Sequence, residues 1–508
     1  MTPDRRASML AVVSAVVVLA SGVAIISWTR HETRQRKVRL EAAARVELAF
    51  PRVDLAPEVA AAQSLLRGEQ RNAPLAIAHL SRACRKNPGD KLAGALLYRA
   101  LLGTPRGVVL KHAAAVQSAT FSPDGTRLLA VCEDNAAHLW DVNRAQEIGE
   151  PLRHEGRVRC AVFSPDGKRI VTGGDDATAR LWNGETGTPI GEPLPHEGAV
   201  WTARFSPDGR HLVTAGKDFL VYIWKSAGPV ELEYSLHHDA PVRDVEFSPD
   251  DLRFVTASDD WTARVWDIAT GRMMFDPLKH QRGKVNTVRF NSDGTHLVTA
   301  SDDRTARVWN AANGTPICNP LEHARAVVSA SFSPDGAKVI TASLDATARL
   351  WSAATGQPLV PPLKHHDAVR AATFSSDGTR VMTASQDGTA QLWDTLSGQP
   401  LGEPLRHEAS VQSAEFSGDG ARVVTASLDG TARVWDAGPT NDPMPAWFSD
   451  FAEYVGGLKL AEGSNEATRA TTERLSVPDG EVDCWARLAR WLLLPAEDRP
   501  THPAAPNP

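Results

Sequence analysis

Imidazole, hydroxyl and carboxylate side chains stand at fixed distances before tryptophan along this sequence. Eight tryptophans follow one another at intervals of 42 or 43 residues: Trp140, Trp182, Trp224, Trp266, Trp309, Trp351, Trp393 and Trp435. An aspartate lies six residues before each: Asp134, Asp176, Asp218, Asp260, Asp303, Asp345, Asp387 and Asp429. A threonine lies ten residues before seven of them: Thr172, Thr214, Thr256, Thr299, Thr341, Thr383 and Thr425. A histidine lies 28 residues before, or 29 in the fifth repeat: His112, His154, His196, His238, His280, His323, His365 and His407.

A hydroxyl, an imidazole and a carboxylate are the parts of a nucleophilic catalytic triad. Here the set recurs in repeat after repeat, and eight identical active sites in one chain are not expected. The same groups can form a chain of hydrogen bonds, in which the imidazole bridges the carboxylate and the hydroxyl, and the hydroxyl accepts from the indole N–H. Because buried polar groups must be paired, we interpret each set as structural. The His, Thr, Asp and Trp of one repeat are called its staple below.

Other groups with possible chemistry give no further site. The adjacent pairs His237-His238 and His365-His366 could suggest a metal, but one histidine of each pair belongs to a staple. The sequence shows no nucleophile motif and no glycine-rich phosphate loop. Five cysteines are scattered without metal-ligand spacing or an obvious disulfide framework: Cys84, Cys132, Cys160, Cys318 and Cys484. We therefore predict no metal, no cofactor, no small-molecule substrate and no catalysis.

The composition is that of a folded protein without a nucleic-acid-binding charge. In 508 residues, 55 Lys and Arg stand against 61 Asp and Glu, which gives a formal net charge of -6. A strongly basic nucleic-acid binder is excluded on global charge, and basic residues are dispersed among acidic ones. The hydrophobic content of 42% excludes overall disorder.

The elements that must position the staples are short strands. In the second repeat we expect strands over Val158–Ser164, Arg169–Gly173, Thr178–Trp182 and Pro189–Leu194, with turns at Ser-Pro-Asp-Gly, Asp-Asp-Ala and Glu-Thr-Gly-Thr between them. A fixed period near 42 with four strands per repeat is the pattern of a β-propeller. The fold class predicted is all-β, with an N-terminal transmembrane helix, a short helical stalk and a helical C-terminal tail.

The His, Thr, Asp and Trp spacing closely resembles the WD-repeat (WD40) family over residues 106–437. The resemblance implies eight blades, with Gly107–Lys111 completing the last blade in place of a missing fourth strand. The first repeat is the least regular, because it has Ala130 at the threonine position and reads DNAAHLW where the second reads DATARLW. It keeps His112, Asp134 and Trp140, so we count it as a blade.

The resemblance also implies a scaffold that binds proteins or peptides on a narrow face. That face is built by the loops before each first strand and between the second and third strands. Blades three and four carry Trp201, Phe219 and Trp261 there, flanked by Arg159 and Arg243. Trp and Arg dominate interface energies, so we expect these five residues to form the partner site. The alternative is that the aromatic residues fill gaps between blades.

The N-terminus has the pattern of a membrane anchor. After a basic segment, 1–8, the span 9–29 is uncharged and about as long as a bilayer is thick. Arg5 and Arg6 precede it, and Arg30, Arg34, Arg36, Lys37 and Arg39 follow it. A cleaved signal peptide is the competing interpretation. We expect a single-pass protein of the cell membrane, with the side of the propeller undecided.

Helical segments flank the propeller. Residues 30–105 are predicted to be a helical stalk, in which two helices stopped by Asn87-Pro88-Gly89 resemble one tetratricopeptide-like unit. Such a unit must pack on a neighbour or serve as a spacer, and we favour the spacer. In the tail, 438–508, two amphipathic helices are expected: PMPAWFSDFAEYVGGLKL, and VDCWARLARWLLLP with Trp485, Leu488, Trp491 and Leu492 on one face. We expect them to pack on the propeller, with membrane contact as the alternative.

The sequence therefore predicts a membrane-anchored interaction scaffold or sensor. The tail resembles the end of WD-repeat regions in membrane-bound bacterial proteins, often Ser/Thr kinases, although only eight residues precede the apolar span here. Two alternatives follow: a sensory region that acts in trans with such a kinase, and a propeller enzyme that uses the central channel.

Overall fold

A computed structural model describes residues 57–66, 73–87, 91–102 and 107–438, together with Ala452, Leu458–Leu460 and Ala467–Arg469. Within these residues, no helix combines the length and apolar character needed to span a membrane. The predicted span 9–29 and the predicted tail helix around Trp485 lie outside the described residues.

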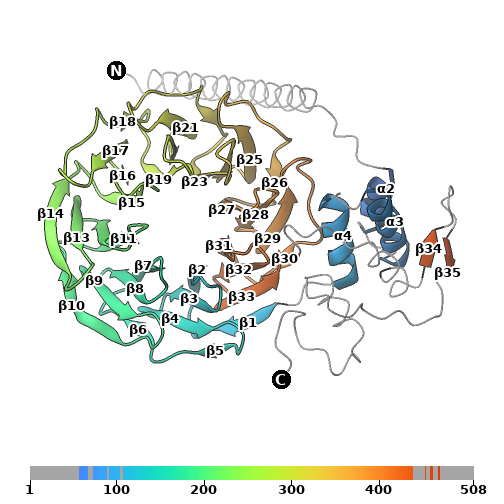
Figure 1. The fold of residues 1–508 in the computed structure, drawn as a ribbon, viewed down its shortest axis with the longest axis horizontal. Coiled ribbons are helices and arrows are strands. Elements are labelled where there is room, and N and C mark those ends of the chain that lie inside the picture. The colour runs from blue at the N-terminus through green and yellow to red at the C-terminus, as the bar shows by residue number, and fades with distance from the viewer. Residues whose placement is uncertain are drawn as a thin grey trace, which may run out of the picture. The chain divides into compact units, whose positions relative to one another are not determined.

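Eight antiparallel sheets form a ring around a central opening (Figure 1). Blade one contains β2 (Val116–Phe121), β3 (Arg127–Cys132), β4 (Ala136–Asp141), β5 (Gln146–Glu147) and β6 (Leu152–Arg153), and blade two contains β7 (Val158–Phe163), β8 (Arg169–Gly174), β9 (Thr178–Asn183) and β10 (Pro189–Pro195). Blade three contains β11 (Val200–Phe205), β12 (His211–Gly216), β13 (Leu220–Lys225) and β14 (Glu231–His237), and blade four contains β15 (Val242–Phe247), β16 (Arg253–Ser258), β17 (Thr262–Asp267) and β18 (Leu278–Lys279). The four strands predicted for the second repeat are present, each ending within one residue of its predicted end.

The second half of the ring repeats this pattern. Blade five contains β19 (Val285–Phe290), β20 (His296–Ser301), β21 (Thr305–Asn310) and β22 (Leu321–Glu322), and blade six contains β23 (Val327–Phe332), β24 (Lys338–Ser343), β25 (Thr347–Ser352) and β26 (Leu363–Lys364). Blade seven contains β27 (Val369–Phe374), β28 (Arg380–Ser385), β29 (Thr389–Asp394) and β30 (Leu405–Arg406), and blade eight contains β31 (Val411–Phe416), β32 (Arg422–Ser427), β33 (Thr431–Asp436) and β1 (Val108–Lys111).

The ring closes as predicted, because β1 pairs antiparallel with β33, with Val108 opposite Val434 and Lys111 opposite Thr431. The eighth blade is therefore built from both ends of the propeller segment. The first repeat forms a complete blade, in which both β5 and β6 pair with β4. The prediction of an eight-bladed propeller is confirmed.

The hydrophobic core lies between neighbouring blades. One buried cluster joins Leu129 and Val131 of blade one to Val158, Phe163 and Trp182 of blade two. Equivalent clusters join the other blades. Each sheet is thus covered on both faces, which explains why the second strands are buried along almost their whole length.

Helices α2 (Pro57–Leu66), α3 (Ala73–Lys86) and α4 (Lys91–Leu102) precede the ring. The Tyr98 hydroxyl of α4 donates to Asp436 Oδ2 at 2.8 Å, and buried residues of the helices and of the last blade belong to one apolar cluster. The preferred spacer interpretation was therefore wrong for these helices, which bury apolar surface on the propeller. Sequence periodicity gives the apolar face of a helix but not the surface that covers it.

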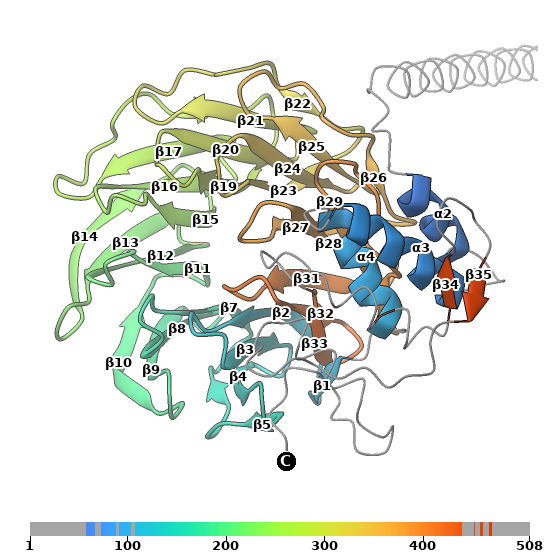
Figure 2. The same cartoon turned by 45° about the vertical axis from the view of Figure 1, so that its right-hand side comes forward.

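A short hairpin of β34 (Leu458–Leu460) and β35 (Ala467–Arg469) lies against α3 (Figure 2). The sequence placed Leu458–Leu460 in the first tail helix, which was wrong. Gly456 and Gly457 directly precede these residues, and glycine is a poor helix former. The alternation Leu-Lys-Leu then suits a short strand.

Candidate protein-interaction site

The staple groups are joined by hydrogen bonds in blades two to eight. Histidine Nε2 lies 2.7 or 2.8 Å from the threonine Oγ1. Tryptophan Nε1 donates to the same oxygen at 2.8 or 2.9 Å. Histidine Nδ1 lies 2.9 to 3.2 Å from the aspartate. A neutral imidazole that donates from Nδ1 and accepts at Nε2 satisfies every group.

The electrostatics of the staples support this protonation state. Burial lowers the pKa of His154, His238, His280, His323 and His407, and hydrogen bonds to the aspartates only partly offset it. Burial opposes ionisation of Asp260 as well, but hydrogen bonds from His238 and Thr262 outweigh it and lower the pKa of that carboxyl. Burial thus favours a neutral imidazole at these five histidines, and hydrogen bonding favours an ionised carboxylate at Asp260.

The staple of blade one lacks these hydrogen bonds. Both ring nitrogens of His112 and the indole Nε1 of Trp140 are shielded from solvent and have no hydrogen-bond partner. Ala130 supplies no hydroxyl here, and burial lowers the pKa of His112 to about 4. Asp134 is hydrogen-bonded to His138 and not to His112, with His138 Nε2 3.0 Å from Asp134 Oδ2.

The predicted site residues of blades three and four lie in equivalent positions of adjacent blades. Phe219, in the turn between β12 and β13, and Trp261, in the turn between β16 and β17, are 38% and 47% exposed. Both have positive φ, 67° and 70°. The same turn position has positive φ in every blade and is occupied elsewhere by Asn135, Ala177, Arg304, Ala346, Gly388 and Gly430.

Positive φ at a large aromatic residue is unfavourable. Because more than a third of the surface of each residue is exposed, packing between blades does not account for these side chains. The alternative that Phe219 and Trp261 fill gaps therefore finds little support in their burial.

Trp201 behaves differently from the other two aromatic residues. It is half-buried at the start of β11, and the guanidinium of Arg243, from β15 of the next blade, lies 5.6 Å from the centre of its ring. That distance allows a cation–π contact. Trp201 thus contributes to the junction of blades three and four. The predicted partner site, formed by Trp201, Phe219, Trp261, Arg159 and Arg243, is called the rim below.

Each flanking arginine is held by an aspartate of its own blade. Arg159 donates two hydrogen bonds to Asp175, both at 2.7 Å. Arg243 is paired with Asp259 through two nitrogens in the same way, and Lys284 donates to Asp259 at 3.0 Å. Neither aspartate was among the residues predicted for the site. Their common place seven residues before the staple tryptophan could have revealed them.

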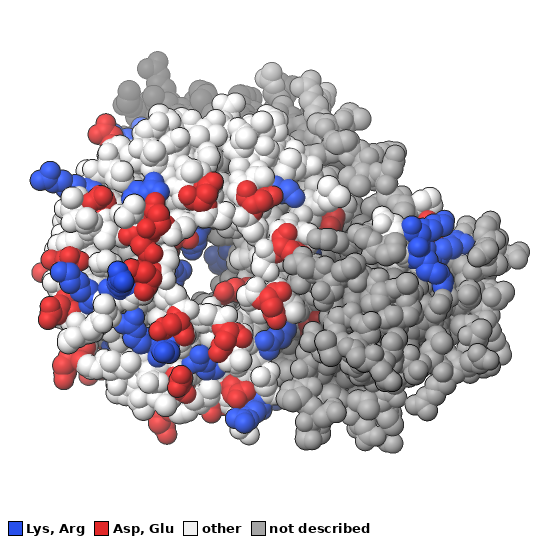
Figure 3. Space-filling model, viewed as in Figure 1, with Lys and Arg blue, Asp and Glu red and all other residues white. Residues whose placement is uncertain are grey.

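The rim thus combines two exposed aromatic residues with arginines that are paired to aspartates. On the face in Figure 3, acidic and basic side chains are interspersed around the central opening, and neither sign forms one continuous area. Such a surface suits a partner with both apolar and polar contacts.

Strands next to the central channel carry buried and half-buried charges that connect blades. Asp244 Oδ2 accepts from the backbone N–H of Val288 at 3.2 Å and pairs with Arg289, and Glu246 accepts from the backbone N–H of Phe290. Burial raises the pKa of Glu246 to about 7. Because these carboxylates accept hydrogen bonds from the next blade, they have a structural role that needs no substrate.

The comparisons identify the family. The model described as "WD domain, G-beta repeat" matches residues 103–141, 147–183, 187–225, 230–267, 275–310, 314–352, 357–394 and 398–436. These segments make up more than half of the chain, and the protein belongs to the WD40 repeat family. Propellers of this family generally act as protein-interaction scaffolds and are generally not enzymes.

Two solved structures are similar to the chain. The computationally designed Ika8 protein has 25% identity and a TM-score of 0.57, over 64% of this chain and 97% of that one. The C-terminal WD40 domain of Sif2 has 24% identity and a TM-score of 0.57, over 65% of this chain and 98% of that one. The second likeness supports the fold alone. No curated protein matches the chain.

Proposed function

We propose that this protein is a membrane-anchored scaffold or sensor, and that it binds a protein or peptide partner on the rim of blades three and four. The observation that carries the proposal is the exposure of Phe219 and Trp261 at turn positions where a large aromatic residue is unfavourable. Local strain of this kind concentrates at functional sites.

The charged groups of the rim support the same proposal. The two arginines are fixed by bidentate ion pairs before any partner arrives, so binding needs little further ordering of their side chains. A partner that buries the two exposed aromatic rings and offers hydrogen-bond acceptors to the arginines would match the rim.

The test is site-specific photo-crosslinking in the native cell. A photoreactive residue at Trp261 should crosslink one partner reproducibly, whereas the same residue at Arg304, the equivalent turn of blade five, should not. The partner is then purified, and its affinity is measured for the double variant Phe219→Gly, Trp261→Gly. Glycine suits positive φ, so we expect at least a tenfold weaker Kd with an unchanged melting temperature. Equal crosslinking at both positions would refute the rim as the binding site.

The anchor is proposed from the uncharged span 9–29 and its basic flanks. Reporter fusions after residue 105 and at the C-terminus test the membrane side. Reporter activity on one side of the membrane only, which disappears when residues 1–29 are deleted, supports a single-pass anchor. Soluble protein that still carries residues 1–29 contradicts it.

A further inference from the structure

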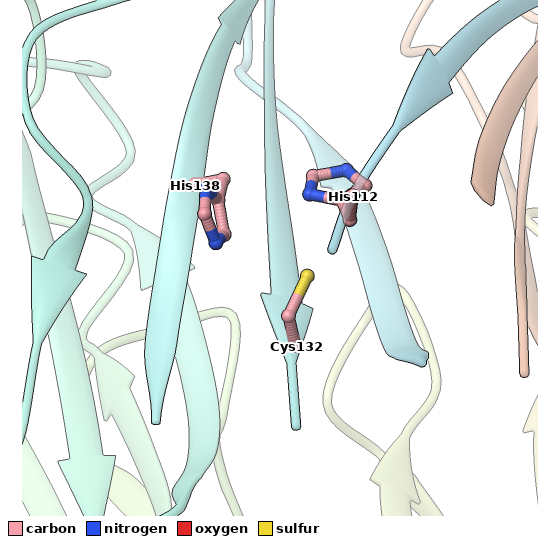
Figure 4. Close-up of side chains that lie close together, drawn as sticks. All are labelled: His112, Cys132 and His138. Carbon is pink, nitrogen blue, oxygen red and sulfur yellow. The ribbon is translucent and has the colours of Figure 1, made fainter. Parts of the chain in front are cut away.

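Blade one brings together three side chains that are found together in no other blade of the described ring. His112 comes from the loop after β1, Cys132 from the end of β3, and His138 from β4. Figure 4 shows the thiol of Cys132 pointing toward the two imidazole rings. One possible ligand atom of each residue lies within 4.8 Å of the other two, and the imidazole centroids are 4.9 Å apart.

The residues at the equivalent positions show how far blade one departs from the rest. The position of Cys132 is occupied elsewhere by Gly174, Gly216, Ser258, Ser301, Ser343, Ser385 and Ser427. The position of His138 is occupied elsewhere by Arg180, Tyr222, Arg264, Arg307, Arg349, Gln391 and Arg433. Blade one has also exchanged the staple threonine for Ala130. The three exchanges remove the normal partner of the staple histidine and place a thiol and a second imidazole beside it.

The unpaired groups are the second observation. His112 is the staple histidine without a hydrogen-bond partner at either nitrogen, although both atoms are shielded from solvent. A shielded imidazole without a partner has lost its hydrogen bonds to water and gained none in return. A metal ion would satisfy it.

We propose that His112, Cys132 and His138 bind a Zn²⁺ ion in blade one. Imidazole and thiolate are ligands that zinc prefers, at about 2.0–2.3 Å in tetrahedral geometry. Such geometry places ligand atoms roughly 3.5 Å apart, so the three side chains must approach one another by about 1 Å.

Neighbouring carboxylates orient one of the three ligands. His138 lies between two carboxylates, with Nδ1 2.5 Å from Glu147 and Nε2 3.0 Å from Asp134. When one of its nitrogens binds the metal, the other keeps a carboxylate partner, which orients the ring as in other zinc sites. The thiol proton leaves to solvent as the sulfur binds.

The test is cobalt(II) titration of the purified full chain after removal of metals. Thiolate coordination gives a near-ultraviolet charge-transfer band, and we expect this band to saturate at one cobalt per chain and to disappear on addition of zinc. Cys132→Ser should abolish the band and weaken zinc binding by roughly a hundredfold or more. Cys318→Ser is the matched control, because this cysteine is also free and lies outside blade one.

A second variant separates metal binding from folding. Ala130→Thr, Cys132→Ser and His138→Arg together restore the pattern of blades four, five, six and eight, so this protein should fold and bind no cobalt at the site. Absence of the band in the intact chain, or a band that survives Cys132→Ser, would overturn the proposal. Binding of copper alone would overturn the assignment to zinc.

Discussion

A single oxygen atom organises each staple. The Thr341 hydroxyl accepts from Trp351 Nε1 at 2.9 Å and lies 2.7 Å from His323 Nε2. The sequence predicted this geometry from spacing, because the same four residue types recur and buried polar groups need partners. It showed that blade one lacks the threonine, but not that Asp134 pairs with His138 and leaves His112 without a partner.

We expect Thr341→Val to destabilise the propeller by about 1–3 kcal/mol. The methyl group keeps the volume but leaves the Trp351 indole and the His323 ring without their shared partner. Chemical denaturation measures the loss. Thr315→Val, at an exposed threonine in a loop of the same ring, should change the stability by less than about 0.5 kcal/mol. Equal effects of the two substitutions would contradict the structural role of the hydroxyl.

The reverse change in blade one should be stabilising in the metal-free protein. Ala130→Thr places a hydroxyl where His112 and Trp140 have none, and we expect a gain of about 0.5–1.5 kcal/mol. The measurement is the free energy of unfolding with a chelator present. A loss of stability would mean that Cys132 and His138 leave no room for the threonine side chain.

At the scale of elements, the strands were predictable and their surroundings were not. Turn residues and alternation located strands of the second repeat such as Arg169–Gly174 to within one residue, because the turns between them require particular backbone angles. The strand Leu458–Leu460 was missed, because three residues carry no periodicity. The packing of α4 through Tyr98 was missed because its partner, Asp436, is distant in the sequence.

Closure by β1 gives a prediction about one strand. Leu110 is 1% exposed within the last blade, whereas its neighbour Val109 is 42% exposed. Leu110→Ala should cost about 2–5 kcal/mol, while Val109→Ala should cost less than about 1 kcal/mol. Denaturation of both variants compares a buried and an exposed side chain on the same strand. Similar losses would show that the pairing of β1 with β33 is not what closes the ring.

At the scale of the whole molecule, the repeat fixes the fold while the departures from it mark the candidate sites. Phe219 and Trp261 break the pattern in blades three and four, and Ala130, Cys132 and His138 break it in blade one. From the sequence alone, Phe219 and Trp261 could be proposed as part of a partner site. For blade one the sequence revealed only the missing threonine, because Cys132 and His138 meet His112 through the pairing of β3 with β4, not through a short spacing.

The summed titration of the staples predicts that the propeller is sensitive to acid. The pKa of the staple histidines such as His323 is lowered on folding, so between the folded and unfolded values the unfolded chain binds more protons. Stability is then present above the unfolded pKa of about 6.5 and decreases as the pH falls below it. The pKa of the aspartates is lowered too, that of Asp429 to about 2, which extends the loss below about pH 4.

Two half-buried channel carboxyls act in the opposite direction. Burial raises the pKa of Glu246 and Glu415 to about 7, so each favours the folded state at low pH and loses that contribution as the pH rises to 7. Between pH 7.5 and pH 4, the five staple histidines with lowered pKa values outnumber these two carboxyls. The six aspartates with lowered pKa values add to the loss only below about pH 4. We therefore expect the free energy of unfolding in urea to fall steadily from pH 7.5 to pH 4. The variant Glu246→Gln should fall more steeply between pH 7 and pH 5, because it lacks one opposing group, and a parallel curve would contradict the raised pKa of Glu246.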